Sequence, residues 1–219
     1  YALRVEAFHK DMQRVRPRFE NLHDPLGLIP EVQPDRVRLD PLGAKAQGVE
    51  ITLDRSSGPL TWWASYSWSE VTDRLDGRDQ LRSWDQTHTL QGGLQWTRNS
   101  WDIALAANVH TGWPTTDLTL VDDGLDEDGE PQFIAIPGPR NKLRHGNFAS
   151  IDFRISRAWK LKRGKLTGFL EVSNVTARRN VCCLDFDFDE DETTGEDVFD
   201  PGVDYWLGLL PAIGVLWEF

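Results

Sequence analysis

Residues 149–156 read ASIDFRIS, and this stretch decides the fold class. Every odd position is apolar, and every even position is Ser, Asp or Arg. Successive side chains of a β-strand point to opposite faces, so strict alternation predicts a strand between an apolar and a polar environment.

The same period of two recurs along the whole chain, while helical periodicity is weak everywhere. Leu90, Leu94 and Trp96 alternate with polar residues in one segment, and Ile103, Leu105 and Val109 do so in the next. We expect about eight strands, near residues 2–13, 44–56, 60–73, 86–98, 101–112, 147–161, 165–177 and 205–219. The predicted fold is therefore all-β, an antiparallel meander.

The connections between these strands alternate in length. Three are tight turns, near 57–59, 98–100 and 162–164, and the links near 14–43, 74–85, 113–146 and 178–204 are long and rich in Pro, Gly and Asp. Transmembrane barrels have short turns at one end and long loops at the other. A soluble sandwich more often mixes loop lengths at both ends.

Strand length and tryptophan placement favour lipid over a soluble core as the apolar environment. Several alternating stretches exceed the usual 5–6 residues of globular strands, and about 9–11 residues cross a bilayer as a tilted strand. Tryptophan settles at the boundary between hydrocarbon and water. One group of Trp lies near the tight turns or the C-terminus (Trp62, Trp63, Trp96, Trp101, Trp159 and Trp217), and another lies nearer the opposite strand ends (Trp68, Trp84, Trp113 and Trp206).

Residues 209–219 read LLPAIGVLWEF and end on an aromatic residue. This segment resembles the closing strand of TonB-dependent outer-membrane receptors, in which the final Phe, here Phe219 with Trp217 before it, is the signal read by the barrel-assembly machinery. Shorter segments resemble the same family: QGVE at 47–50, RSWDQ at 82–86 with His88, HTGWP at 110–114, and EVSNV at 171–175 with Asn180. The resemblance covers essentially the whole chain.

The resemblance implies that residues 1–219 are the C-terminal portion of a 22-stranded transmembrane β-barrel in the bacterial outer membrane. The family's plug domain and TonB box have no counterpart in these residues, and we expect them upstream of Tyr1. The implied partners are the lipid bilayer, the barrel-assembly machinery, the TonB complex, and a small nutrient or metal-chelate ligand. The loops near 14–43, 113–146 and 178–204 would contribute ligand contacts.

Composition excludes some classes of protein. The formal net charge of −11 argues against nucleic acid as a partner. No run approaches 18 apolar residues, so no helical membrane span is expected. Adjacent Cys182 and Cys183 predict neither a zinc site nor a disulfide framework, and both a vicinal disulfide and two free thiols remain open.

No catalytic set stands out, and we expect no enzyme activity. Asp85 and His88 could form part of a hydrolase site at the outer rim, but hydrogen bonding at the start of a strand explains them better. Arg154, Asp152 and Glu171 fall on proposed lumen-facing positions of neighbouring strands. They could contact the plug or line the transport route, but a cross-strand ion pair is the favoured interpretation.

The acidic segment 185–197 is a candidate calcium site. Asp185, Asp187 and Asp189 have the spacing of the first ligands of a calcium loop, and Glu196 falls at the twelfth position. Position six is Glu190 rather than Gly, and no helices flank the segment, so a solvated acidic loop is the main alternative. We expect no other cofactor.

Two further functions remain open from the sequence. One is a complete barrel of about eight strands that acts as an anchor or adhesion protein, with an interior filled by side chains. The other is a secreted β-sandwich that binds carbohydrate.

Overall fold

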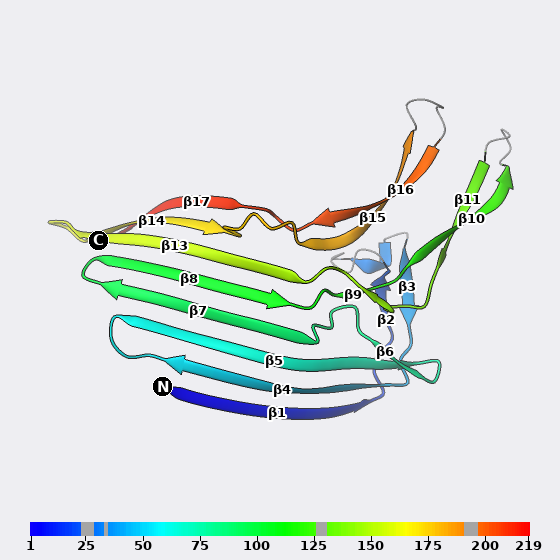
Figure 1. Cartoon of the computed structure of the whole chain (residues 1–219), viewed down its shortest axis with the longest axis horizontal. Helices are drawn as coiled ribbons and strands as arrows, with labels where there is room; N and C mark the ends of the chain where they lie inside the picture. The colour runs from blue at the N-terminus through cyan, green and yellow to red at the C-terminus, as the bar shows by residue number, and fades with distance from the viewer. Residues whose placement is uncertain (23–28, 33–34, 126–130, 191–196) are drawn as a thin grey trace.

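A computed structural model describes residues 1–22, 29–32, 35–125, 131–190 and 197–219, and for parts of strands β10, β11, β15 and β16 it describes the backbone alone. Eight long strands form one antiparallel sheet (Figure 1). They are β1 (Ala2–Gln13), β4 (Gly43–Arg55), β5 (Leu60–Leu75), β7 (His88–Arg98), β8 (Trp101–His110), β13 (Phe148–Lys160), β14 (Lys165–Ser173) and β17 (Leu210–Glu218). The predicted all-β antiparallel meander is confirmed, with strand limits that differ by up to five residues.

Each long strand pairs with the next long strand along the chain, from β1 at one edge to β17 at the other. β1 and β17, both described in full, do not pair with each other, so the sheet is open. In a closed barrel of eight strands these two strands would have to pair.

The tight turns all lie at one end of the sheet, on the left of Figure 1, which we call the tight-turn end. Asn99 and Gly164 occupy two of these turns with φ values of 56° and 89°. Such positive φ values suit Gly and Asn, which tolerate the left-handed region best. These residues therefore allow the chain to reverse within two to four residues.

The opposite end, which we call the long-loop end, contains additional short elements. They are β2 (Arg18–Asn21), the 3₁₀ turn η1 (Pro30–Val32), β3 (Arg36–Leu39), β6 (Arg78–Leu81), β9 (Pro114–Thr115), β10 (Leu118–Leu125), β11 (Pro131–Pro137), β12 (Leu143–Arg144), β15 (Val181–Glu190) and β16 (Asp197–Tyr205). Eight of them form two-stranded sheets, namely β2–β3, β9–β12, β10–β11 and β15–β16, and β6 pairs with β5 of the main sheet. Hairpins β10–β11 and β15–β16 project away from the main sheet (Figure 1). The long links predicted from the sequence therefore contain short strands that were not predicted, and residues 205–209 lie outside the last strand of the sheet.

Buried residues concentrate at the long-loop end, including the parts of β4 and β5 that lie there. Among the described residues, the buried apolar side chains are Leu39, Ala44, Ala46, Leu75, Cys182 and Cys183. No described helix is long and apolar enough to cross a membrane.

Candidate functional site

The register of the sheet gathers its apolar side chains onto a single face, which we call the apolar face. Residues directly opposite each other on neighbouring antiparallel strands share a face. Leu94 pairs with Leu105, Leu105 with Phe153, and Phe153 with Val172. The same parity continues through all eight strands, so the face extends from Leu3 on β1 to Val215 on β17.

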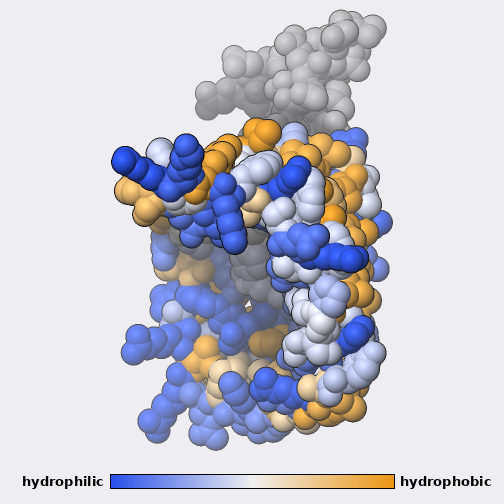
Figure 2. Space-filling view, turned by 90° about the vertical axis from the view of Figure 1, so that its left-hand side faces the viewer, coloured by the Kyte–Doolittle hydropathy of each residue, from blue (hydrophilic) through white to orange (hydrophobic). Residues whose placement is uncertain are grey.

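The apolar face is uncovered over the part of the chain that the structure describes. Leu90 exposes 52% of its surface and Ile151 39%, although both lie on inner strands of the sheet. Seen from the tight-turn end, hydrophobic residues gather along the right-hand margin and hydrophilic residues on the left (Figure 2). A contiguous exposed apolar surface of this size marks an interaction with lipid or with another macromolecule.

The apolar face is a band with limits at both ends. On β5 its positions are apolar or aromatic from Leu60 to Trp68, and the same face then carries Glu70 and Arg74. Nine residues of strand match the length that a tilted strand needs to cross a bilayer. At the tight-turn end the band stops at arginines, among them Arg55.

Five of the six Trp assigned to the tight-turn end lie on the apolar face: Trp62, Trp96, Trp101, Trp159 and Trp217. Trp63 does not, because it follows Trp62 directly and adjacent residues of a strand point to opposite faces. Its indole covers Gly93, where an added Cβ would lie 2.5 Å from the indole nitrogen.

Three of the four Trp assigned to the long-loop end form a cluster, and the fourth, Trp68, lies on the apolar face of β5. The Trp113 ring lies 5.1 Å from Trp84 and 5.8 Å from Trp206, and it also stacks near His110. Trp84 and Trp206 are 48% and 36% exposed. The cluster thus joins the links that follow β5, β8 and β14.

The opposite face of the sheet, which we call the polar face, carries hydrogen bonds and an ion pair between neighbouring strands. Arg154 donates to Glu171 at 2.7 Å, and the two residues are direct register partners. The predicted cross-strand ion pair is confirmed. Asp152 belongs to a different interaction, since it accepts hydrogen bonds from Ser150 and from the backbone N–H of Asn174.

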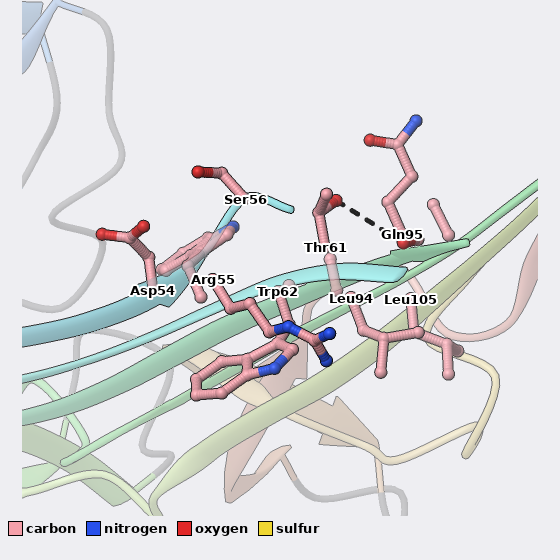
Figure 3. A pocket seen from close by; sticks show the side chains of 12 residues that line it. Asp54, Arg55, Ser56, Thr61, Trp62, Leu94, Gln95 and Leu105 are labelled. Atoms are coloured by element: carbon pink, nitrogen blue, oxygen red, sulfur yellow. Dashed lines mark hydrogen bonds between the residues drawn. The ribbon is translucent and has the colours of Figure 1, made fainter. Parts of the chain in front are cut away.

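A hollow of about 380 Å³ lies near the tight-turn end and includes residues of both faces. Asp54, Thr61 and Gln95 lie on one side of the sheet, and Arg55, Trp62, Leu94 and Leu105 lie on the other (Figure 3). The view therefore shows the separation of the two faces within a few residues of sequence.

Charged residues form a buried network at the long-loop end. Asp73 is fully buried and accepts hydrogen bonds from Arg82 at 2.9 and 3.1 Å, and from Arg18. Arg18 also donates to Glu20 at 2.6 Å. This network holds hairpin β2–β3 against the end of β5 and the segment after β6.

Arg140 and Asn141 extend the network to the link between β8 and β13. Arg140 pairs with Glu20, and Asn141 donates to the backbone oxygen of Leu81 at 2.7 Å. Ser83 donates to Glu20 at 2.9 Å and accepts from both Arg140 and Asn141. Burial lowers the pKa of the Arg140 guanidinium, with Arg18 adding to the effect and Glu20 and Asp73 opposing it.

Asp85 is the second buried carboxylate of this end. It accepts a hydrogen bond from the backbone N–H of Val71 at 2.9 Å, and it pairs with Arg144 at 2.6 Å. His88 instead contacts the hydroxyl of Tyr66 at 2.8 Å. Asp85 and His88 therefore engage different partners, as expected for residues that organise the start of β7.

The structure places the candidate calcium residues only in part. Asp185, Asp187 and Asp189 lie on β15, where Asp187 pairs with Asp200 of β16, and Glu196 lies outside the described residues. Within the described ranges, no group of three or more His, Cys, Asp or Glu is arranged to hold a metal ion. The calcium site stays a prediction.

The other residues predicted to matter lie in several places. Cys182 and Cys183 are buried on β15, and the vicinal disulfide between them is not formed. Trp217 lies on β17 with its indole donating to the backbone oxygen of Arg163, and Phe219 follows the strand with 99% exposure.

The links near 14–43 and 113–146 meet in the buried network described above. The link near 178–204 is attached separately, through Asn180 on the backbone of Ala149.

Comparison of the sequence with protein-family models and with curated proteins finds no match.

Proposed function

We propose that this chain forms part of the wall of an outer-membrane β-barrel of the TonB-dependent receptor type. In this arrangement the apolar face contacts lipid and the polar face lines the lumen. The long-loop end faces outward and contributes to ligand binding, and uptake is driven through TonB. The chain carries out no covalent chemistry.

The uncovered apolar face is the observation that carries this proposal. A water-soluble sheet of eight strands would need a second layer to bury such a surface. Lipid satisfies the same requirement without a second layer. The band has the height of a tilted transmembrane strand, and it is bounded by tryptophan and arginine at the tight-turn end.

The open sheet favours a larger barrel over a complete one of eight strands. Both edges carry unpaired backbone groups, which lipid cannot satisfy. Further strands on both edges would satisfy them. The motifs that resemble TonB-dependent receptors support 22 strands and a plug domain.

The buried network supports the outward role of the long-loop end. Ion pairs with low exposure hold the links near 14–43, 74–85 and 113–146 to one another, which pre-organises the surface they present. The ligand is proposed only by class, as a small nutrient or metal chelate.

Migration in detergent gels tests the barrel directly. A folded outer-membrane barrel resists unfolding until boiled, so we expect the intact protein that contains this chain to migrate differently before and after heating. A chain that is monodisperse in plain buffer, with indole fluorescence typical of a buried core, would support the secreted sandwich instead.

Uptake experiments with the intact receptor test the transport step. We expect ligand accumulation by whole cells that depends on TonB and is lost when segment 113–146 is deleted. Accumulation that is unchanged in cells without TonB would contradict the proposed coupling.

A further inference from the structure

Arginine side chains stand on the lipid-facing side of the sheet at the tight-turn end. Arg98 pairs in register with Trp101, and Trp101 pairs with Arg157. The three residues form one row across β7, β8 and β13. Because direct partners share a face, Arg98 and Arg157 lie on the apolar face, on either side of Trp101.

Trp159 completes the group. The Arg157 guanidinium carbon lies 4.9 Å from the centre of the Trp101 ring and 5.5 Å from that of Trp159. The second register partner of Arg157 is Gly168 on β14. A Cβ at Gly168 would lie 3.2 Å from the Trp159 ring, so the glycine makes room for that indole.

Neither arginine has an acidic partner among the residues that the structure describes. Carboxylates do lie nearby, but on the other face. Asp102 accepts hydrogen bonds from Gln95 and Thr97, and Glu218 pairs with Lys165. Asp102 and Glu218 therefore lie on the polar face, as Lys165 does, and not on the face that carries Arg98 and Arg157.

Cationic groups on a lipid-facing surface are costly unless they reach the interface and meet an anion. Guanidinium matches phosphate geometrically through two parallel N–H donors, and contacts with indole rings leave that edge free. Indole itself prefers the headgroup level. The tight turns add Lys162 and Arg163 and no acidic residue.

We propose that Arg98, Trp101, Arg157 and Trp159 form a binding site for the phosphate of an anionic phospholipid headgroup, in the leaflet at the tight-turn end. The site rests on the proposed membrane-spanning function. The site gives the barrel wall a preference for anionic lipid in the leaflet at the tight-turn end. The long-loop end is strongly acidic and does not share this preference.

Quenching of tryptophan fluorescence by brominated lipids tests the site in the intact barrel protein that contains this chain, folded in mixed micelles. Brominated phosphatidylglycerol and brominated phosphatidylcholine are compared as quenchers. We expect the wild type to be quenched by both and to prefer the anionic lipid. Each arginine near the surface contributes about fivefold to this preference, so Arg157→Gln and Arg98→Gln should each reduce it by about that factor.

Arg179→Gln is the matched control. Arg179 lies 4.1 Å over the Tyr205 ring, but at the long-loop end. This variant should keep the wild-type preference, and free inorganic phosphate should not displace the lipid. Heat-dependent migration confirms that each variant is folded before it is measured.

The outcomes separate the two proposals. Absence of quenching by either lipid contradicts the membrane-spanning function itself. Quenching without a preference, or a preference that survives in both Arg157→Gln and Arg98→Gln, overturns the headgroup site alone. The headgroup site is also overturned if Arg179→Gln loses the preference for anionic lipid to the same extent, or if free phosphate displaces the lipid.

Discussion

Leu90 and Ile151 expose 52% and 39% of their surface on inner strands of the sheet, whereas Asp73 and Asp85 at the long-loop end expose 0% and 2%. In a water-soluble protein this distribution would be reversed. The protein does not cover the apolar side chains of the sheet, so an external solvent must cover them. The long-loop end satisfies its own charges internally, so the two regions should respond differently to lipid, charge and pH.

The largest effect is expected from Asp73→Ala in the buried network. The change leaves Arg18 and Arg82 without their shared carboxylate, and breaking a buried pair costs about 3–5 kcal/mol. The partners are about one-third exposed, so we expect the lower part of this range. Urea unfolding of the intact barrel protein in detergent measures the loss.

A loss below about 1 kcal/mol for Asp73→Ala would mean that the network contributes little. The long-loop end would then be held by its hairpins alone.

Leu105→Arg tests the apolar face and should cost about 2–4 kcal/mol in a bilayer, because arginine near the mid-plane is poorly solvated. Ala106→Arg is the matched control, since the neighbouring residue lies on the polar face in register with Asp152. Unfolding in lipid vesicles measures both variants. Equal costs for the two would remove the distinction between the faces.

Glu171→Gln breaks the ion pair with Arg154, whose partners are 42% and 45% exposed. Exposed pairs contribute about 0–1 kcal/mol. We expect a loss within that range under the same urea conditions. A loss as large as that of Asp73→Ala would show that the polar face is shielded from water.

Acidification should weaken the long-loop end slightly. Burial lowers the pKa of His145, so the folded protein holds this ring neutral where the unfolded chain already protonates it. The unfolded state then binds more protons, and stability falls as pH drops below the usual histidine value of about 6.5. Urea unfolding of the wild type and His145→Gln between pH 8 and pH 5 should show a weaker decline in the variant.

Period-two alternation predicted the long strands and their two faces because it depends only on neighbouring residues. The polarity of each residue indicates which face of the strand it occupies. The tight turns at 57–59, 98–100 and 162–164 followed from short polar spacers. Trp62 and Trp63 also lie on opposite faces, as alternation requires, although the sequence analysis placed both in the group of Trp near the tight turns.

The buried network could not be predicted in this way. Arg140 and Glu20 are 120 residues apart, and no spacing in the sequence relates them. Hairpin β15–β16 was missed because its acidic composition is typical of solvated loops. The row of Arg98, Trp101 and Arg157 required the register, which strand positions alone do not determine.

The central claim is that the apolar face contacts acyl chains. A spin label placed in turn at each position from 149 to 156, in a variant with Cys182 and Cys183 replaced by Ser, tests it in lipid vesicles. Oxygen, which concentrates in the bilayer, should relax the labels at odd positions, and a water-soluble nickel chelate should relax those at even positions. If the odd positions are accessible to neither reagent, or only to the chelate, the apolar face is not in contact with lipid.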